Sequence, residues 1–179
     1  MAAPLPEIAA ARVFEALAEV RTLHPQVKWL PPNKLHLTLV FLGPTEPDRV
    51  EELAQATARM ATGHQPFDVV TGDAGGKLGG KRGGVIWLRL AKGGHEVAQL
   101  SLDLDHAIGS GTYTATSGPR PHLTVARHVT AAALEDLRVV ASQVILGWTV
   151  DRIVLFRSHT DPGGSRYEEL ASAELGSTP

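Results

Sequence analysis

The sequence predicts an α+β fold in which two similar lobes share one site. The tripeptide His-Leu-Thr occurs twice, at residues 36–38 and 122–124, and each copy lies in an apolar run typical of a strand. A helix, a strand with this tripeptide and a further helix recur in both halves of the chain. Helices and strands do not alternate in regular βαβ units, and no linker-like stretch divides the chain. We therefore expect residues 1–179 to form a single domain of two intertwined lobes.

The first elements are a helix and two short strands. Apolar residues recur at three- and four-residue spacing over residues 6–22, which predicts a helix, and Pro6 is tolerated in its first turn. Residues 27–30 and 35–42 are apolar or alternating and are predicted as strands, with a proline-rich turn between them. The second of these strands carries the first tripeptide.

A second helix and a hairpin follow. The helix is predicted over residues 45–60, because Thr45 or Asp48 could cap its start and acidic residues follow in its early turns. Residues 66–71 and 85–91 are predicted as strands on either side of a glycine-rich basic loop.

The last elements repeat the scheme of the first half. Residues 96–108 are predicted as a helix with an apolar stripe, and the strand with the second tripeptide comes next. A helix is expected near residues 131–141, then a long strand over 144–156 and a last strand over 166–173.

The composition limits the class of protein. The chain has 179 residues, 43% of them hydrophobic, which is enough for a substantial core. The net charge of −2 predicts that any contact with nucleic acid is a local basic groove and not a general polyanion-binding surface. The absence of cysteine excludes disulfides, thiolate nucleophiles and cysteine-ligated metals. With no candidate membrane helix or signal peptide, we expect a cytoplasmic protein without membrane contact, and a monomer.

The paired tripeptides suggest the chemistry. Residues i and i+2 of a strand share a face, so each copy presents an imidazole and a hydroxyl together. Two imidazoles with ordinary pKa values near ~6.5 can act as general base and general acid at neutral pH, while hydroxyls steady phosphate oxygens. In-line cleavage of a phosphodiester needs such a set. One tripeptide alone could be merely the polar face of a strand, but two copies favour a catalytic pair.

Three ordered segments carry a resemblance to a known family. They are residues 29–43 (WLPPNKLHLTLVFLG), residues 121–127 (PHLTVAR), and residues 155–158 (LFRS) with 162–167 (PGGSRY). With them the chain resembles the two-histidine phosphoesterase superfamily, and within it the RNA 2′,3′-cyclic phosphodiesterases, historically called 2′-5′ RNA ligases. The resemblance extends from about Leu5 to Leu175.

The resemblance implies a fold, an activity and residue roles. The fold would be bilobal, with two pseudo-symmetric lobes, each an antiparallel sheet flanked by helices, and the active site in a central cleft. The activity would be metal-independent hydrolysis of a terminal 2′,3′-cyclic phosphate to a 2′-phosphate, without a cofactor. His36 would protonate the departing O3′, His122 would activate water, and Thr38, Thr124 and Arg127 would bind phosphate.

The chain departs from the family pattern in two places. Only residues 1–4 precede the first helix, so an opening core strand is expected to be shortened or absent. No aromatic residue stands beside the second Pro-His, so base stacking is expected to fall to Phe41, Tyr113 or Tyr167. Phe41 could instead be a core residue.

The glycine-rich basic segment admits several interpretations. It matches the nucleotide-binding pattern G-x-x-x-x-G-K up to its final position, where Arg82 stands in place of the Ser or Thr that would bind Mg²⁺. A solvated hairpin loop is the simpler interpretation, and an RNA-contacting loop with Lys77, Lys81 and Arg82 is the alternative. No histidine shows metal-ligand spacing, so no metal site is predicted. His128 would share the face of His122 if the strand stays regular.

RNA ends or cyclic nucleotides are the partners that these features predict. Two other functions stay open: hydrolysis of a small cyclic phosphate such as ADP-ribose cyclic phosphate, and a non-catalytic module that binds a nucleotide or RNA.

Overall fold

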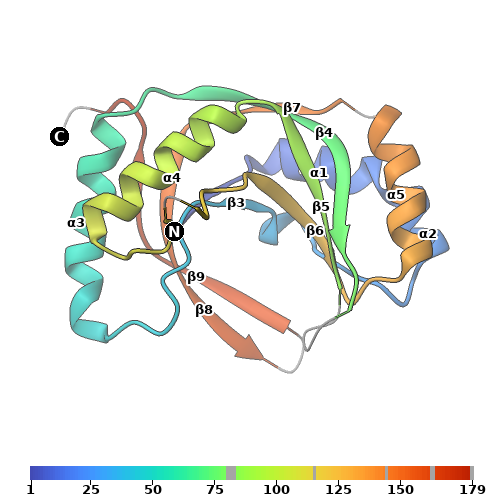
Figure 1. Cartoon of the computed structure of the whole chain (residues 1–179), viewed down its shortest axis with the longest axis horizontal. Coiled ribbons are helices and arrows are strands. Elements are labelled where there is room, and N and C mark those ends of the chain that lie inside the picture. The colour runs from blue at the N-terminus through green and yellow to red at the C-terminus, as the bar shows by residue number, and fades with distance from the viewer. Residues whose placement is uncertain (80–83, 115, 144, 162–163, 178–179) are drawn as a thin grey trace.

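The chain folds into one curled antiparallel sheet with helices packed against it, in a computed structural model that describes residues 1–179 except 80–83, 115, 144, 162–163 and 178–179 (Figure 1). The order of strands in the described chain is β7-β4-β5-β6-β3-β1-β8-β9, and β2 pairs with β6. The predicted α+β class is confirmed. The strands of the two halves form a single hydrogen-bonded sheet, and not two separate ones, because β3 pairs with β6.

The strands are β1 (Ala2–Pro4), β2 (Lys28–Trp29), β3 (His36–Thr38), β4 (Phe67–Lys77), β5 (Val85–Lys92), β6 (His122–Arg127), β7 (Gly147–Val150), β8 (Arg152–Asp161) and β9 (Gly164–Glu174). The helices are α1 (Glu7–Ala16), α2 (Ala18–Leu23), α3 (Val50–Thr62), α4 (Gly94–Ile108) and α5 (Ala131–Gln143), with 3₁₀ turns at Pro32–Lys34 and Pro47–Arg49.

The helices divide between the two halves of the sheet. Helix α5 packs on β4 and α2 packs on α5, whereas α3 packs on β8 and β9 and against α4. Figure 1 shows α3 and α4 at one end of the molecule and α2 and α5 at the other. In the part of the chain that the structure describes, no helix is long and apolar enough to cross a membrane.

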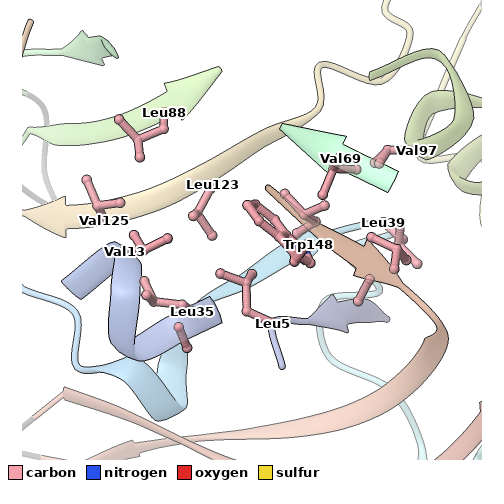
Figure 2. Close-up of a cluster of buried hydrophobic side chains, with 14 of the residues drawn as sticks. Leu5, Val13, Leu35, Leu39, Val69, Leu88, Val97, Leu123, Val125 and Trp148 are labelled. Carbon is pink, nitrogen blue, oxygen red and sulfur yellow. The ribbon is translucent and has the colours of Figure 1, made fainter. Parts of the chain in front are cut away.

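The core lies behind the strands that carry the tripeptides. Leu37 and Leu123, the middle residues of the two copies, have no exposed surface, as the alternation of side chains along a strand requires. Figure 2 shows part of this core, where Leu123 and Val125 of β6 gather with Val13 of α1. Burial of each such side chain stabilises the fold by about 1.5–3 kcal/mol. The core therefore fixes which face of β3 and β6 is left for polar residues.

The opening strand, which the sequence predicts to be shortened or absent, is present as the three residues of β1. β1 lies between β3 and β8, with Ala3 opposite Leu37 and Ala2 opposite Val154. The Met1 ammonium donates a hydrogen bond of 2.7 Å to the Val40 carbonyl, and its burial lowers the pKa of this amine to about 6. A short strand thus occupies the middle of the sheet and not an edge.

The helix predicted over residues 45–60 begins later. Pro47 forces Glu46 into an extended conformation, with ψ of 143°, so a 3₁₀ turn precedes α3 at Val50. Neither predicted residue caps the helix, since α3 has no side-chain cap and the Thr45 hydroxyl donates to the Gly43 carbonyl. The first helix is also interrupted, at Leu17, which separates α1 from α2.

The long strand predicted over residues 144–156 is two strands. β7 pairs with β4 in one half of the sheet, and β8 pairs with β1 in the other. The chain crosses between the halves at Asp151, whose carbonyl accepts a hydrogen bond of 2.7 Å from the Leu175 amide. The strand predicted over 35–42 is likewise paired only at His36–Thr38.

Candidate active site

The two tripeptides lie on neighbouring antiparallel strands. Leu37 of β3 is opposite Leu123 of β6. In an antiparallel register through this pair, His36 lies across from Thr124, and Thr38 lies across from His122. All four polar side chains then share the face opposite the buried leucines. The structure therefore brings together the four residues that the sequence singled out, in a nearly two-fold arrangement.

Each histidine is held by the same hydrogen bond. Nδ1 of His36 lies 2.9 Å from the carbonyl of Lys34, and Nδ1 of His122 lies 2.7 Å from the carbonyl of Arg120. A carbonyl only accepts, so Nδ1 carries the proton in both rings. Nε2 is thereby left on each ring to accept or donate a proton.

The surroundings of His36 are more enclosed. Its ring meets the ring of Tyr167 edge-on, with centroids 5.2 Å apart, and the Phe156 ring lies at 6.3 Å. Burial lowers the pKa of His36, and the positive charges of the N-terminus, Arg127 and His122 lower it further, against the hydrogen bond to the Lys34 carbonyl. These surroundings therefore favour the neutral form of His36.

His122 packs on a residue that the sequence analysis missed. The Trp87 ring of β5 lies with its centroid 5.4 Å from that of His122. Trp87 is opposite Thr124 in the sheet, and its neighbour Arg89 is opposite His122. Both side chains therefore share the face of the tripeptides. The alternation of Val85, Trp87 and Arg89 along a predicted strand is the sequence signal that could have found them.

A β-bulge directs Arg127 into the site. On a regular strand a residue three positions after Thr124 would point to the opposite face. The register between β5 and β6 shifts between Ile86 and Trp87, which restores Arg127 to the cleft face. Its side chain lines the same cavity as His36. β6 ends at Arg127, so the regular strand that would place His128 on the face of His122 does not continue. His128 has a φ of 54° and lies exposed at the rim of that cavity.

The tripeptides open onto two adjoining cavities. The larger, of about 1400 Å³, is lined by His36, Thr38 and Arg127 and by Phe156 and Tyr167 of the β8–β9 ribbon. The smaller, of about 350 Å³, contains His122 and shares Thr38 with the first. Among the described residues that line the larger cavity, none is an aspartate or a glutamate, whereas several are lysines and arginines. Such a cleft suits an anionic ligand.

The predicted base-contacting residues divide into three cases. Tyr167 lies against His36 in the large cavity. Phe41 is 72% exposed on the rim of that cavity, so its interpretation as a core residue is wrong: it follows the last paired residue of β3, where the chain leaves the sheet. Tyr113 lines the small cavity, and its hydroxyl donates to the Leu39 carbonyl.

A buried carboxylate holds the loop that carries Tyr113. Asp105 of α4 accepts hydrogen bonds from the Ser110 hydroxyl and from the amides of Thr112 (2.9 Å) and Tyr113 (3.4 Å). Burial raises the pKa of Asp105, but these hydrogen bonds outweigh it, and the pKa is lowered overall. The loop beside the small cavity is thus tied to the carboxylate form of Asp105.

The described part of the glycine-rich segment continues β4 as far as Lys77, and the next element is the strand β5 and not the helix that a P-loop needs. A Cβ on Gly75 would lie 2.5 Å from the Trp87 indole nitrogen, and one on Gly76 would lie 2.9 Å from Leu134 of α5. The two glycines therefore admit a tryptophan on the cleft face and a leucine on the core face. Lys77 ends β4, while Lys81 and Arg82 lie outside the described residues.

Comparison with family models and curated proteins gives consistent matches. The model of the 2′-5′ RNA ligase superfamily matches residues 4–162. An RNA 2′,3′-cyclic phosphodiesterase of Bacillus subtilis (strain 168) is 25% identical, over 96% of this chain and 93% of that protein. A protein of the same description from Thermus thermophilus is 29% identical, over 96% and 86%.

Solved structures share the fold. The crystal structure of the Thermus thermophilus protein TT0787 superposes with a TM-score of 0.73 at 26% identity and covers 98% of this chain and 96% of that one. The crystal structure of E. coli LigT complexed with 3′-AMP also gives 0.73, at 24% identity and with the same coverage.

Proposed function

The chain belongs to the 2′-5′ RNA ligase superfamily, and from that premise we propose that it is an RNA 2′,3′-cyclic phosphodiesterase that leaves a 2′-phosphate. The family and the names of the relatives indicate an enzyme of the cyclic phosphodiesterase type. The observation that carries the proposal is the cross-strand arrangement of His36, Thr38, His122 and Thr124. Each histidine there keeps Nε2 for proton transfer, beside a cleft rich in cations.

The reaction uses the two imidazoles in opposite senses. Nε2 of His122 removes a proton from water as the water oxygen attacks phosphorus. The bond from phosphorus to O3′ breaks, and Nε2 of protonated His36 gives its proton to O3′. The phosphate stays on O2′. Thr38, Thr124 and Arg127 donate hydrogen bonds to the non-bridging oxygens, on which charge develops.

The acid role of His36 requires the substrate. In the protein alone, burial and neighbouring cations lower the pKa of His36, which disfavours the imidazolium. The negative charge of a bound cyclic phosphate acts in the opposite direction and raises this pKa. His36 therefore takes up its proton as the anion binds, and the proton is available when O3′ leaves.

The hydrolysis needs no metal ion in this mechanism. Proton transfer and phosphate binding are both supplied by side chains and not by a cation. Within the described chain, no group of three His, Asp or Glu residues is placed so that it could hold a metal ion.

The direct test is hydrolysis of a 2′,3′-cyclic-phosphate-ended oligonucleotide and of 2′,3′-cyclic mononucleotides, with and without EDTA. We expect turnover that EDTA leaves unchanged and that falls by at least about 10²-fold in the folded double variant His36→Ala/His122→Ala. Activity that EDTA abolishes and Mg²⁺ or Mn²⁺ restores would contradict the two-histidine mechanism. Binding of either substrate without turnover would instead identify a non-catalytic module.

A further inference from the structure

Three cations stand in one row across four strands. Lys77 of β4 is opposite Val85 of β5, Val85 is opposite Arg127 of β6, and Arg127 is opposite Lys28 of β2. Cross-strand partners project from the same face of a sheet. Lys77, Arg127 and Lys28, which we call the cation row, therefore share one face although they are far apart in the sequence.

The cation row begins in the cavity that contains His36 and extends beyond it along the sheet. Arg127 and Lys28 both line the large cavity that contains His36 and Thr38. Trp87 follows Val85 by two residues on β5 and contacts His122, so the row and the tripeptides occupy the same face. Figure 1 shows β4, β5 and β6 side by side, and the row lies where β4 and β6 end and where β5 and β2 begin. At ~4.8 Å between adjacent strands, the row spans about 14 Å.

The charges of the cation row have no carboxylate partner among the described residues. Lys28 and Arg127 are directly opposite each other, an arrangement of like charges that destabilises a sheet. Within the described chain, no ion pair joins Lys28, Arg127 or Lys77 to an aspartate or glutamate. By contrast, Lys92 at the other end of β5 lies 3.3 Å from Asp68. A bound polyanion would relieve this repulsion.

Given the proposed function, we propose that the cation row binds backbone phosphates of the RNA strand that leads to the cyclic end. A cyclic mononucleotide carries one phosphate, and that phosphate lies between His36 and His122 in the proposed reaction. Only an oligonucleotide has further phosphates that can reach Lys28 and Lys77. The enzyme therefore hydrolyses oligonucleotide ends with a higher kcat/KM than small cyclic nucleotides.

The test compares two substrates in the double variant Lys28→Gln/Lys77→Gln, which keeps Arg127. For a cyclic-phosphate-ended tetranucleotide we expect kcat/KM to fall about tenfold at low salt, with its logarithmic salt slope shallower by about 1.4, the value for two phosphate contacts on a single strand. For a 2′,3′-cyclic mononucleotide we expect a fall several times smaller than for the tetranucleotide, because its one phosphate is bound by Arg127 and the threonines and contacts neither lysine. Lys92→Gln, at the far end of β5 and outside the row, is the control and should match the wild type on both substrates.

The outcomes separate this inference from the proposed function. Wild-type protein that hydrolyses neither substrate contradicts the proposed function. Wild-type protein that hydrolyses both, with a double variant equal to it on both, overturns only the role of the cation row. Equal losses on the two substrates also overturn it, because the lysines would then act at the cyclic phosphate itself. A melting temperature of the double variant at or above that of the wild type checks that the variant is folded.

Discussion

The strands β3 and β6 share a backbone arrangement but differ in what surrounds them. In both, Nδ1 of the histidine donates to the carbonyl two residues earlier, and the middle leucine is fully buried. His36 is enclosed by Phe156 and Tyr167, which desolvate it, whereas His122 rests on Trp87 beside the smaller cavity. The repeated tripeptide thus determines where each imidazole points, and for His36 the surrounding residues lower the pKa.

The strongest test of this comparison is removal of each imidazole. His36→Ala and His122→Ala should each lower kcat by about 10²- to 10⁴-fold, the usual contribution of a general acid or base. The double variant should lose little more, since both groups serve one transition state. Steady-state kinetics on the cyclic-ended oligonucleotide measures this, with circular dichroism to confirm folding. Near-normal turnover by a folded single variant would count against the assignment.

Beside the small cavity that contains His122, the Asp105 carboxylate accepts hydrogen bonds from Ser110, Thr112 and Tyr113. Asp105→Asn should lower the free energy of unfolding by about 1–3 kcal/mol at pH 7, because hydrogen bonds to a charged acceptor are weakened. The lowered pKa makes this stabilisation fully present above the ordinary carboxyl value of 3.8 and lost as pH falls through the lower value of the folded protein.

Urea unfolding at several pH values measures the effect of the Asp105 substitution. Asp73→Asn, at an exposed position on β4, is the matched control and should leave stability unchanged. An equal difference between wild type and Asp105→Asn at pH 7 and near pH 2 would refute the pH dependence.

The charge state of His36 should appear in the pH profiles. The alkaline limb of kcat/KM reports the free protein, in which the pKa of His36 is lowered, so activity should fall as pH rises through that value. The alkaline limb of kcat reports the complex, in which the phosphate raises the pKa, so it should lie at higher pH. Rate measurements from pH 4 to 10 test this. If the alkaline limbs of kcat and kcat/KM coincide, the substrate does not shift the pKa of His36.

The enclosure of His36 can be relaxed directly. Tyr167→Ala should admit water to the ring and raise the pKa of His36 toward its ordinary value. Trp87→Ala, which removes the corresponding neighbour of His122, should leave the pKa of His36 nearly unchanged. NMR titration of the imidazole signals gives both values. If Tyr167→Ala leaves the His36 titration where it was, the enclosure is not the cause.

The sequence was sufficient for local features of the fold and not for relations between distant strands. The alternation around Leu37 and Leu123 predicted both strands and the face that each histidine shares with its threonine. The β-bulge that turns Arg127 into the cleft depends on pairing with β5, which no single strand reveals. The crossing at Asp151 was missed because its flanking residues form one continuous apolar pattern.

Pairing between strands that are distant in the sequence also explains why Trp87 and Lys28 are not predicted as site residues. Trp87 contributes to the site only because Gly75, opposite on β4, leaves room for the indole. Gly75 and Gly76 are predicted as part of a loop because glycine usually interrupts a strand. In the structure they lie within β4, because Trp87 on one face of the sheet and Leu134 on the other leave no room for a Cβ. Lys28 joins Arg127 by the same kind of long-range pairing.

The position of the product phosphate tests most directly whether the two similar strands have different roles. With His36 as the acid at O3′ and His122 as the base, hydrolysis of a 2′,3′-cyclic mononucleotide should give the 2′-phosphate. Phosphorus NMR of the product, supported by its resistance to a 3′-specific phosphatase, distinguishes the isomers. A predominantly 3′-phosphate product would contradict the account, because the acid and base roles of the two histidines, or the orientation of the substrate between them, would then be reversed.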